Sequence, residues 1–271
     1  MIKVATIARN PIDSPNMTAN DAAILERVTA LLKEQGAEVV SIGEGQEIPH
    51  DTQVVCTMSR TAKTIELLKR AEKQGVIVLN STTAVENCSR KRFMEILRNK
   101  GIPQPAYSIV GSKDTAVNDC YPCWIKKADG WSNHKEDVCF AKNSAETNNA
   151  IEQMAQRGIK ECIRMQHCEG DIVKFYGIAD RLFHFTYPSG GKFGHEEING
   201  APRHYAFDAT ALKVIAQRAA QAIGLEIYGG DAIITPQGDI FIIDMNDFPS
   251  FTAIRETAAV EIATLITSKT K

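Results

Sequence analysis

Residues 224–251, GLEIYGGDAIITPQGDIFIIDMNDFPSF, decide the fold that we expect for this chain. Asp231 opens an apolar run, Pro236 and Gly238 mark a turn, and a second apolar run follows at 240–243. Proline and glycine at such positions are typical of a tight turn between two strands. The stretch therefore predicts a β-hairpin whose open end carries acidic and amide side chains.

The open end of this hairpin brings oxygen-bearing side chains together. Side chains alternate along a strand, so Asp244 and Asn246 lie on the same face. With a turn of four residues, Thr235 pairs with Ile240, and Asp231 lies opposite Asp244. Two carboxylates buried together need a positive charge between them, and a hard divalent cation such as Mg²⁺, which usually arrives with nucleotide phosphates, supplies it. The alternative is that both aspartates cap turns or face water.

The composition of the whole chain is that of an ordinary globular protein. Of its 271 residues, 44% are hydrophobic, and 31 basic residues stand against 33 acidic ones, for a net charge of -2. This excludes a disordered or fibrous protein and gives no bulk attraction to nucleic acid or to an anionic membrane. The chain starts without a signal-peptide profile, no apolar run reaches membrane-spanning length, and the seven cysteines are scattered, so we expect a cytoplasmic protein.

The pattern of apolar residues predicts three compact parts. Strands and helices alternate in residues 1–100, which predicts an N-terminal α/β domain with a parallel sheet. The prolines of GIPQP separate it from a small central α+β domain at 101–168, and a C-terminal domain follows at 169–271. Besides the hairpin, the expected strands lie at 2–8, 38–42, 51–57, 76–79, 107–110, 123–127, 137–141, 171–178 and 181–186, and the expected helices lie at 22–34, 61–74, 90–100, 144–157, 208–223 and from 254 onward.

Two basic residues stand where a phosphate group could be bound. Lys126 lies near the end of the strand PCWIKK (122–127), and the loop of small residues after it can cover phosphate oxygens that the lysine reaches. Arg90 begins a helix, where a nearby phosphate is favoured. Each residue taken alone is more often a solvated surface charge. Trp131 in the loop is placed to cover a substrate, whereas CYPC (120–123) lacks a second ligand pair for zinc and is interpreted as core or strand.

Taken in order, these elements resemble the ATP-grasp superfamily. The resemblance rests on a basic residue eleven positions before GIPQP, a strand ending in lysine, a hinge containing glutamine and an acidic hairpin ending in D-x-N; here these are Arg90, Lys126, residues 165–168 (MQHC), Asp231, Asp244 and Asn246. It covers roughly residues 76–255, and the preceding segment fits the N-terminal α/β domain of the superfamily. The resemblance implies ATP held between the small central domain and the C-terminal sheet, with two Mg²⁺ ions bridging its phosphates.

Within the superfamily, the chain is most similar to the inositol trisphosphate/tetrakisphosphate kinases. DMNDFPSF at 244–251 looks like their I-D-x-N-x-F-P-G-Y motif, although Ser250 stands where they have glycine. Lys174 occupies a position where ligases typically have arginine, and His134 follows Gly130 as in the kinases' G-x-x-S-H segment. The next resemblance is to ribosomal-protein-glutamate-ligase-like carboxylate–amine ligases, whose last motif usually reads E-x-N-x-S-P-G.

The kinase resemblance implies a role for each candidate residue. The metal ligands are Asp231, Asp244 and Asn246; the nucleotide-binding residues are Arg90, Lys126, Lys174 and the hinge residues Gln166, His167 and Cys168, whose backbone receives the adenine edge. The candidates that face the transferred phosphoryl group or an anionic acceptor are Lys174 and His134, with Arg203 or Lys192 assisting from a glycine-rich loop. His167 is interpreted as more structural than catalytic, and His134 has the alternative of a surface histidine. A polyanionic inositol phosphate needs many cations, for which Arg9 and Arg60 are the nearest candidates on the early strands.

The sequence leaves two other functions open. In a carboxylate–amine ligase, the same ATP-binding residues would phosphorylate a substrate carboxylate, and an amine would then displace phosphate. A nucleotide-sensing or scaffold protein with a decayed site is the third alternative, against which the intact acidic set argues. In either enzyme the expected partners are ATP, Mg²⁺ and a small anionic or carboxylate-bearing substrate, without nucleic acid or membrane, and the oligomeric state stays open.

Overall fold

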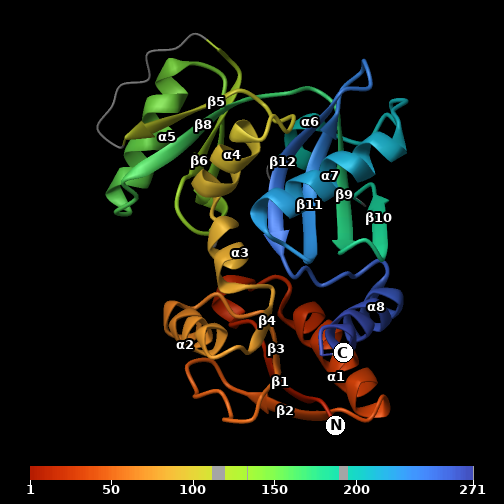
Figure 1. Ribbon diagram of the computed structural model, residues 1–271. Coiled ribbons are helices and arrows are strands. Elements are labelled where there is room, and N and C mark those ends of the chain that lie inside the picture. The colour runs from red at the N-terminus through yellow and green to blue at the C-terminus, as the bar shows by residue number, and fades with distance from the viewer. Residues whose placement is uncertain (112–119, 133, 189–194, 271) are drawn as a thin grey trace.

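The computed structural model describes residues 1–111, 120–132, 134–188 and 195–270, and it contains three four-stranded sheets (Figure 1). The first sheet is parallel, as expected from the alternation of strands and helices, and its strand order is β2-β1-β3-β4. Its elements are β1 (Lys3–Ile7), α1 (Thr18–Glu34), β2 (Glu38–Ile42), β3 (Val54–Thr57), α2 (Ala62–Lys73) and β4 (Ile77–Leu79). Every residue of β3 is buried, which is typical of a central strand covered by helices on both faces.

The second sheet is antiparallel and has the order β5-β8-β6-β7. Its elements are β5 (Tyr107–Gly111), β6 (Cys123–Lys127), β7 (Val138–Ala141), α5 (Ser144–Gln156) and β8 (Glu161–Gln166). β8 is missing from the strands expected from the sequence. Arg164 interrupts its apolar pattern, but this side chain is buried, donates a hydrogen bond to the carbonyl of Cys120 and lies over the ring of Tyr121.

The third sheet is antiparallel, with the order β10-β9-β11-β12. Its elements are β9 (Asp171–Ile178), β10 (Leu182–Thr186), α6 (His195–Asn199), α7 (Ala209–Ile223), β11 (Ile227–Ile234), β12 (Ile240–Asp247) and α8 (Arg255–Ser268). The ends of α7 agree with the sequence, because the side chain of Asp208 caps its first turn and Gly224 ends it with a positive φ. The short helix α6 was not expected.

In the hairpin of β11 and β12, the two aspartates pair as predicted, but the strands pair in a different register near the turn. Asp231 lies opposite Asp244, but Ile234, and not Thr235, pairs with Ile240. Thr235 belongs to the turn, because its hydroxyl accepts hydrogen bonds from the backbone N–H groups of Gln237 and Asp239. A β-bulge next to Asp231 removes the one-residue offset, so the two carboxylates still face each other.

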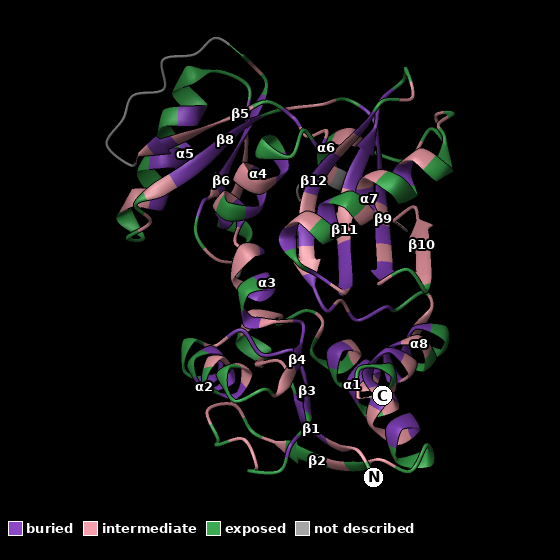
Figure 2. Cartoon of the chain, viewed as in Figure 1, coloured by how far each residue is buried: buried purple, intermediate pink, exposed green. Residues whose placement is uncertain are grey.

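Helices join the three sheets into one arrangement. α8, the last helix of the chain, lies beside α1, the first helix, at the first sheet. Both helices contribute to one hydrophobic cluster (Figures 1 and 2). α3 (Thr82–Asn87) leads into α4 (Arg90–Asn99), which packs against α7 in the cluster of the third sheet. The division into domains at 1–100, 101–168 and 169–271 stays a prediction. Among the described helices, none combines the length and the apolarity that crossing a bilayer requires.

A buried ion-pair network connects the first sheet to the end of β12. Asp247 is 1% exposed, and its Oδ1 lies 2.6 Å from Nη2 of Arg60, which precedes α2. Arg9, which follows β1, donates from its Nη2 to the carbonyl oxygens of Asp247 and Phe248 at 3.0 and 2.9 Å. Because these charges are almost completely removed from water, each depends on the others for compensation.

We expect Asp247→Ala to lower the free energy of unfolding by about 3–5 kcal/mol, because it leaves Arg60 buried without its carboxylate. Urea denaturation followed by circular dichroism measures the change. The control is Glu38→Ala, which removes an exposed carboxylate 3.6 Å from Lys3 and should cost less than about 1 kcal/mol. If both substitutions lower the free energy of unfolding by the same amount, Asp247 does not hold the first and third sheets together.

Candidate functional site

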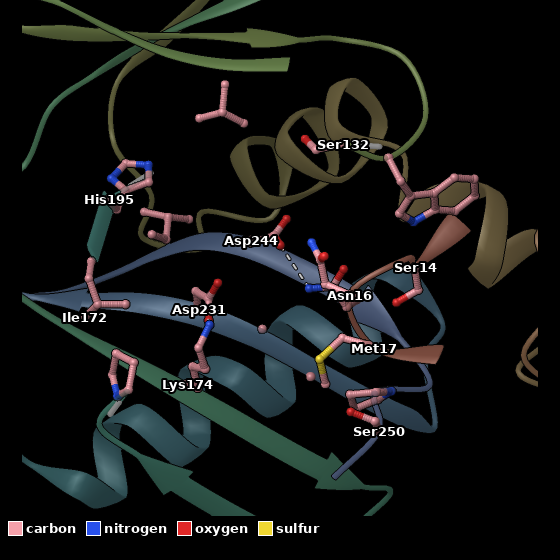
Figure 3. Close-up of a pocket in the computed structure, with 18 of the residues that line it drawn as sticks. Ser14, Asn16, Met17, Ser132, Ile172, Lys174, His195, Asp231, Asp244 and Ser250 are labelled. Atoms are coloured by element: carbon pink, nitrogen blue, oxygen red, sulfur yellow. Dashed lines mark hydrogen bonds and ion pairs between the residues drawn. The ribbon is translucent and has the colours of Figure 1, made fainter. Parts of the chain in front are cut away.

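A cleft of about 1390 Å³ is lined by residues that belong to all three sheets or to the loops that follow their strands. The hairpin contributes its carboxylates, β6 contributes Lys126, and the segment after β1 contributes Ser14, Asn16 and Met17 (Figure 3). The candidates from the sequence that line this cleft are Arg9, Arg60, Arg90, Lys126, Trp131, His134, Lys174, Asp231, Asp244 and Asn246. The candidate metal ligands and the candidate phosphate-binding cations therefore share one space.

The acidic wall of the cleft is formed by Asp231, Asp244 and Asn246. Asn246 donates a hydrogen bond from Nδ2 to Oδ2 of Asp244 at 2.9 Å, and Lys174 Nζ lies 3.3 Å from Oδ1 of Asp231 (Figure 3). Gly230 is required between them, because a Cβ there would lie 2.4 Å from the backbone oxygen of Asp244. The hairpin backbone thus brings its two carboxylates together at close range.

The donor atoms of this wall fit a hard cation. Two carboxylates and an amide supply oxygen ligands, which Mg²⁺ prefers, and Mg²⁺ commonly completes its shell with water and substrate phosphates. Nowhere in the described ranges do three or more His, Cys, Asp or Glu side chains form a group that could hold a metal alone. A cation at Asp231 and Asp244 would therefore need further oxygen ligands from a bound molecule.

Two buried cations face this acidic wall. Lys126 is 4% exposed and Arg90 is 9% exposed, and no acidic side chain among the described residues lies within 4 Å of either one. Arg90 donates to the carbonyl of Lys127 and to the hydroxyl of Ser132, at 2.9 and 3.0 Å, and its Nε has no hydrogen-bond partner within the described ranges. Buried positive charge without a counterion favours an anionic ligand.

Burial is the main influence on the pKa values of these two cations. It lowers the pKa of Lys126 to about 7, with a further contribution from the charge of Arg90, whereas Asp244 and Asp231 act in the opposite direction. Burial also lowers the pKa of Arg90. Phosphate oxygens placed between these groups would restore the charged form of Lys126.

The other candidates lie at the edge of the cleft or outside it. His134 is exposed on the rim, where its backbone N–H donates to Oδ2 of Asp137. Arg203 does not line the cleft, because its guanidinium pairs with Glu169 at 3.5 Å and donates to Tyr205 Oη at 2.9 Å on the surface. Lys192 falls outside the described residues, as does most of the glycine-rich loop before α6.

The hinge residues lie at the end of β8 and directly after it, and some of their backbone N–H groups already donate hydrogen bonds within the protein. The N–H groups of Gln166 and His167 donate to the carbonyls of Ala106 and Pro122. His167 accepts a hydrogen bond from Trp124 Nε1 at 3.1 Å, in agreement with a structural role. The hinge side chains do not line the cleft, so any contact with adenine would involve the remaining backbone groups.

Sequence reasoning missed several residues of the cleft. Trp124 of β6 is buried, yet it also lines the cleft, where the ring of His195 of α6 lies against it. Asp13 and Asp21, beside Arg9, line the opposite end. The prolines and polar residues after the first strand were the available signal, but such loops occur at many strand ends.

The end of the cleft near the first sheet carries little free positive charge. Arg9 is within 3.8 Å of both Asp21 and Asp247, and Arg60 is paired with Asp247 while its guanidinium also lies 4.6 Å from the ring centroid of Trp131. Burial raises the pKa of Asp21 and lowers that of Arg9 to about 10. The two arginines expected to bind a polyphosphorylated acceptor are thus committed to contacts within the protein.

Comparison with known proteins identifies this architecture. No family model matches the chain. A probable alpha-L-glutamate ligase of Histophilus somni (strain 2336) is 22% identical over 210 residues, which are 73% of this chain and 68% of that protein. The D-alanine–D-alanine ligase of Bacillus anthracis, in complex with ATP, matches over 100% of both chains with a TM-score of 0.72 and 12% identity. The ATP-grasp ligase PsnB, complexed with minimal precursor, Mg and ADP, covers 98% of both chains with a TM-score of 0.69 and 16% identity. The chain has the ATP-grasp fold.

This result confirms the fold expected from the sequence. It also changes which group of enzymes within that fold is the better supported. The relatives described above are named ligases, and the preferred resemblance to inositol phosphate kinases receives no support from them. The carboxylate–amine ligases, which the sequence placed second, are the better supported branch.

For the ligand-free ATP-grasp chain, we expect Lys126 to titrate near pH 7, because its burial disfavours the ammonium form. NMR of isotope-labelled lysine side chains measures this midpoint, and Lys126→Arg assigns the signal. Lys91 serves as the internal contrast, because Glu161 raises its pKa above the ordinary value of 10.5. A midpoint for Lys126 close to that of Lys91 would show that the cleft does not desolvate this amine.

Proposed function

We propose that this protein is an ATP- and Mg²⁺-dependent ligase that joins a carboxylate to an amine. The observation that carries the proposal is that Lys126 and Arg90, two buried cations with no acidic side chain of the described residues within 4 Å, share one cleft with Asp231 and Asp244, which lie opposite each other in the hairpin. A magnesium–nucleoside triphosphate has the complementary charges, since its phosphates match the cations and its metal matches the carboxylates. The ATP-grasp fold supports the same ligand.

Each charged residue of the cleft has a proposed part in holding the nucleotide. Lys126 and Arg90 bind oxygens of the α- and β-phosphates, while Asp231, Asp244 and Asn246 hold Mg²⁺. When bound, the metal neutralises charge on the β- and γ-phosphates. Lys174, now 3.3 Å from Asp231, would face the γ-phosphate once the metal takes over that carboxylate. Catalysis by these residues consists of positioning and charge stabilisation.

The proposed reaction has two steps. A carboxylate oxygen of the first substrate attacks the γ-phosphorus, the bond to the β-phosphate oxygen breaks, and ADP leaves an acyl phosphate. The nitrogen of a neutral amine then attacks the acyl carbon, phosphate departs, and the nitrogen loses a proton as the amide forms. The walls of the cleft exclude water from the acyl phosphate, which would otherwise be hydrolysed.

The charge near the first sheet favours a ligase over a polyphosphate kinase. Arg9 and Arg60 are neutralised by Asp21 and Asp247, and Asp13 adds a further carboxylate to this end of the cleft. An acceptor with several phosphates would meet these acids without enough free cations. A small substrate with one carboxylate, or with a carboxylate and an amine, fits this balance better. The ligase names of the relatives support the same choice.

We further propose a cytoplasmic location. All seven cysteines are free thiols, and burial raises the pKa of Cys56 to about 12, which keeps it protonated and unreactive. ATP and Mg²⁺ are also available in that compartment.

We expect Asp244→Asn to abolish the Mg²⁺-dependent part of ATP binding and to lower activity on the order of 100-fold, because it removes a charged metal ligand. Thermal shift with ATP, with and without Mg²⁺, provides the binding measurement. Asp239→Asn is the matched control, since Asp239 lies exposed in the turn of the same hairpin. An unchanged Mg²⁺-dependent shift in Asp244→Asn would refute the metal assignment.

The reaction class predicts trapping of the acyl phosphate. With ATP, Mg²⁺ and a panel of amino acids and small carboxylic acids, hydroxylamine should divert the intermediate to a hydroxamate, which ferric iron detects. Release of ADP should require the carboxylate, and an amine should give an amide that mass spectrometry identifies. Transfer of labelled γ-phosphate to an inositol phosphate, with no hydroxamate from any acid, would instead support the kinase.

A further inference from the structure

The short helix α6 reaches into the end of the cleft that lies between the second and third sheets. We define the aromatic slot as Trp124 of β6 and Phe140 of β7, whose ring centroids are 4.9 Å apart and which both line the cleft. The imidazole of His195 stacks on Trp124, with centroids 3.9 Å apart and planes inclined by 34°. A flat aromatic group therefore already covers the face of Trp124.

His195 lacks the polar contacts that a resident of this slot would normally have. Neither Nδ1 nor Nε2 has a hydrogen-bond partner among the residues that the structure describes, although both atoms are buried. A neutral imidazole offers one donor and one acceptor, and leaving both unsatisfied is costly. Burial lowers the pKa of His195 well below its ordinary value, with a further contribution from the nearby charge of Lys126. The slot thus accepts a flat ring next to the phosphate-binding lysine without being built for histidine.

The C-terminal end of α6 contacts the backbone of the hinge and of the residues that follow it. Asn199 donates from Nδ2 to the carbonyl oxygens of Cys168 and Gly170, at 3.1 and 2.7 Å. Its own Oδ1 is buried and has no hydrogen-bond partner in the described part of the chain, so this amide too is only half satisfied there. The carbonyl of Cys168 belongs to the hinge backbone that the sequence predicts to receive the adenine edge. α6 therefore places a ring against Trp124 and an amide donor on the hinge backbone, which are the two kinds of contact that a purine base would make at these groups.

We infer that α6 occupies the nucleobase subsite of the nucleotide-free protein, and that ATP binding requires His195 and Asn199 to leave it. The inference rests on the proposed ATP-dependent function and adds a regulatory contact within the same site. Because only the fraction of molecules with α6 withdrawn can bind ATP, the apparent dissociation constant equals the intrinsic one divided by that fraction. Contacts that hold α6 in place thus weaken nucleotide binding.

The first test measures whether His195 covers Trp124. Trp131→Phe leaves Trp124 as the single tryptophan, since the chain has 2. In this background, His195→Ala should increase the Stern–Volmer constant for acrylamide quenching in nucleotide-free protein, and added adenosine should reverse the increase. His50→Ala, which removes an exposed histidine far from the cleft, is the matched control. If His195→Ala quenches like the control, His195 does not occupy the slot and the inference is wrong.

The second test measures nucleotide affinity by calorimetry with Mg-ATP. His195→Ala and Asn199→Ala should each bind about 3- to 10-fold more tightly than the wild-type protein, because each loses contacts that hold α6 in the subsite. Equal or weaker binding by both variants would make α6 a wall of the nucleotide site and overturn the inference. Absence of Mg-ATP binding in the wild-type protein and in every variant would instead refute the proposed function on which the inference rests.

Discussion

The separation of charge across the cleft is the constraint on which the rest of the molecule depends. Lys126 and Arg90 are buried on the side of the second sheet, and Asp231 and Asp244 lie opposite each other on the third. They influence one another electrostatically, since the two carboxylates act to raise the pKa of Lys126, yet neither cation makes a direct ion pair with them. Keeping Lys126 and Arg90 buried with no acidic side chain of the described residues within 4 Å costs stability, and a ligand that brings negative charge to them removes that cost. The hydrophobic packing of the three sheets supplies the stability that offsets this cost.

The end of β12 links this site to the remainder of the structure. Consecutive residues of a strand point to opposite faces, so Asn246 faces the cleft while Asp247 meets Arg60 and Arg9. The backbone that sets the position of the candidate metal ligands is therefore held by the same ion pairs that attach the first sheet. A substitution of Arg9 or Arg60 is therefore expected to affect the site by displacing the end of β12, even if that arginine does not contact a substrate.

Local patterns in the sequence were sufficient for most strands and helices and for the pairing of Asp231 with Asp244. They failed where a residue's role depends on a distant partner. The turn is one residue longer than expected at Thr235, and only the β-bulge beside Asp231 restores the expected pairing of the aspartates. In β8, the charged Arg164 interrupts the apolar pattern because it donates a hydrogen bond to a carbonyl of another segment. Stacking of His195 on Trp124 joins residues far apart in the chain, so no periodicity or spacing could indicate it.

The preference for a kinase over a ligase, which the comparisons do not support, has a related origin. The letters DFPSF after Asn246 carried much of the kinase resemblance, but Phe248 and Phe251 are both 0% exposed and pack in the cluster between α1 and α8. These phenylalanines pack in the core where the chain leaves β12, and neither of them lines the cleft. A motif conserves its letters for packing as readily as for chemistry. The acceptor is instead constrained by the groups that line the far end of the cleft, and there Asp13 and Asp21 balance the arginines. Charge at that end, rather than the motif beside it, favours a small carboxylate over a polyphosphate.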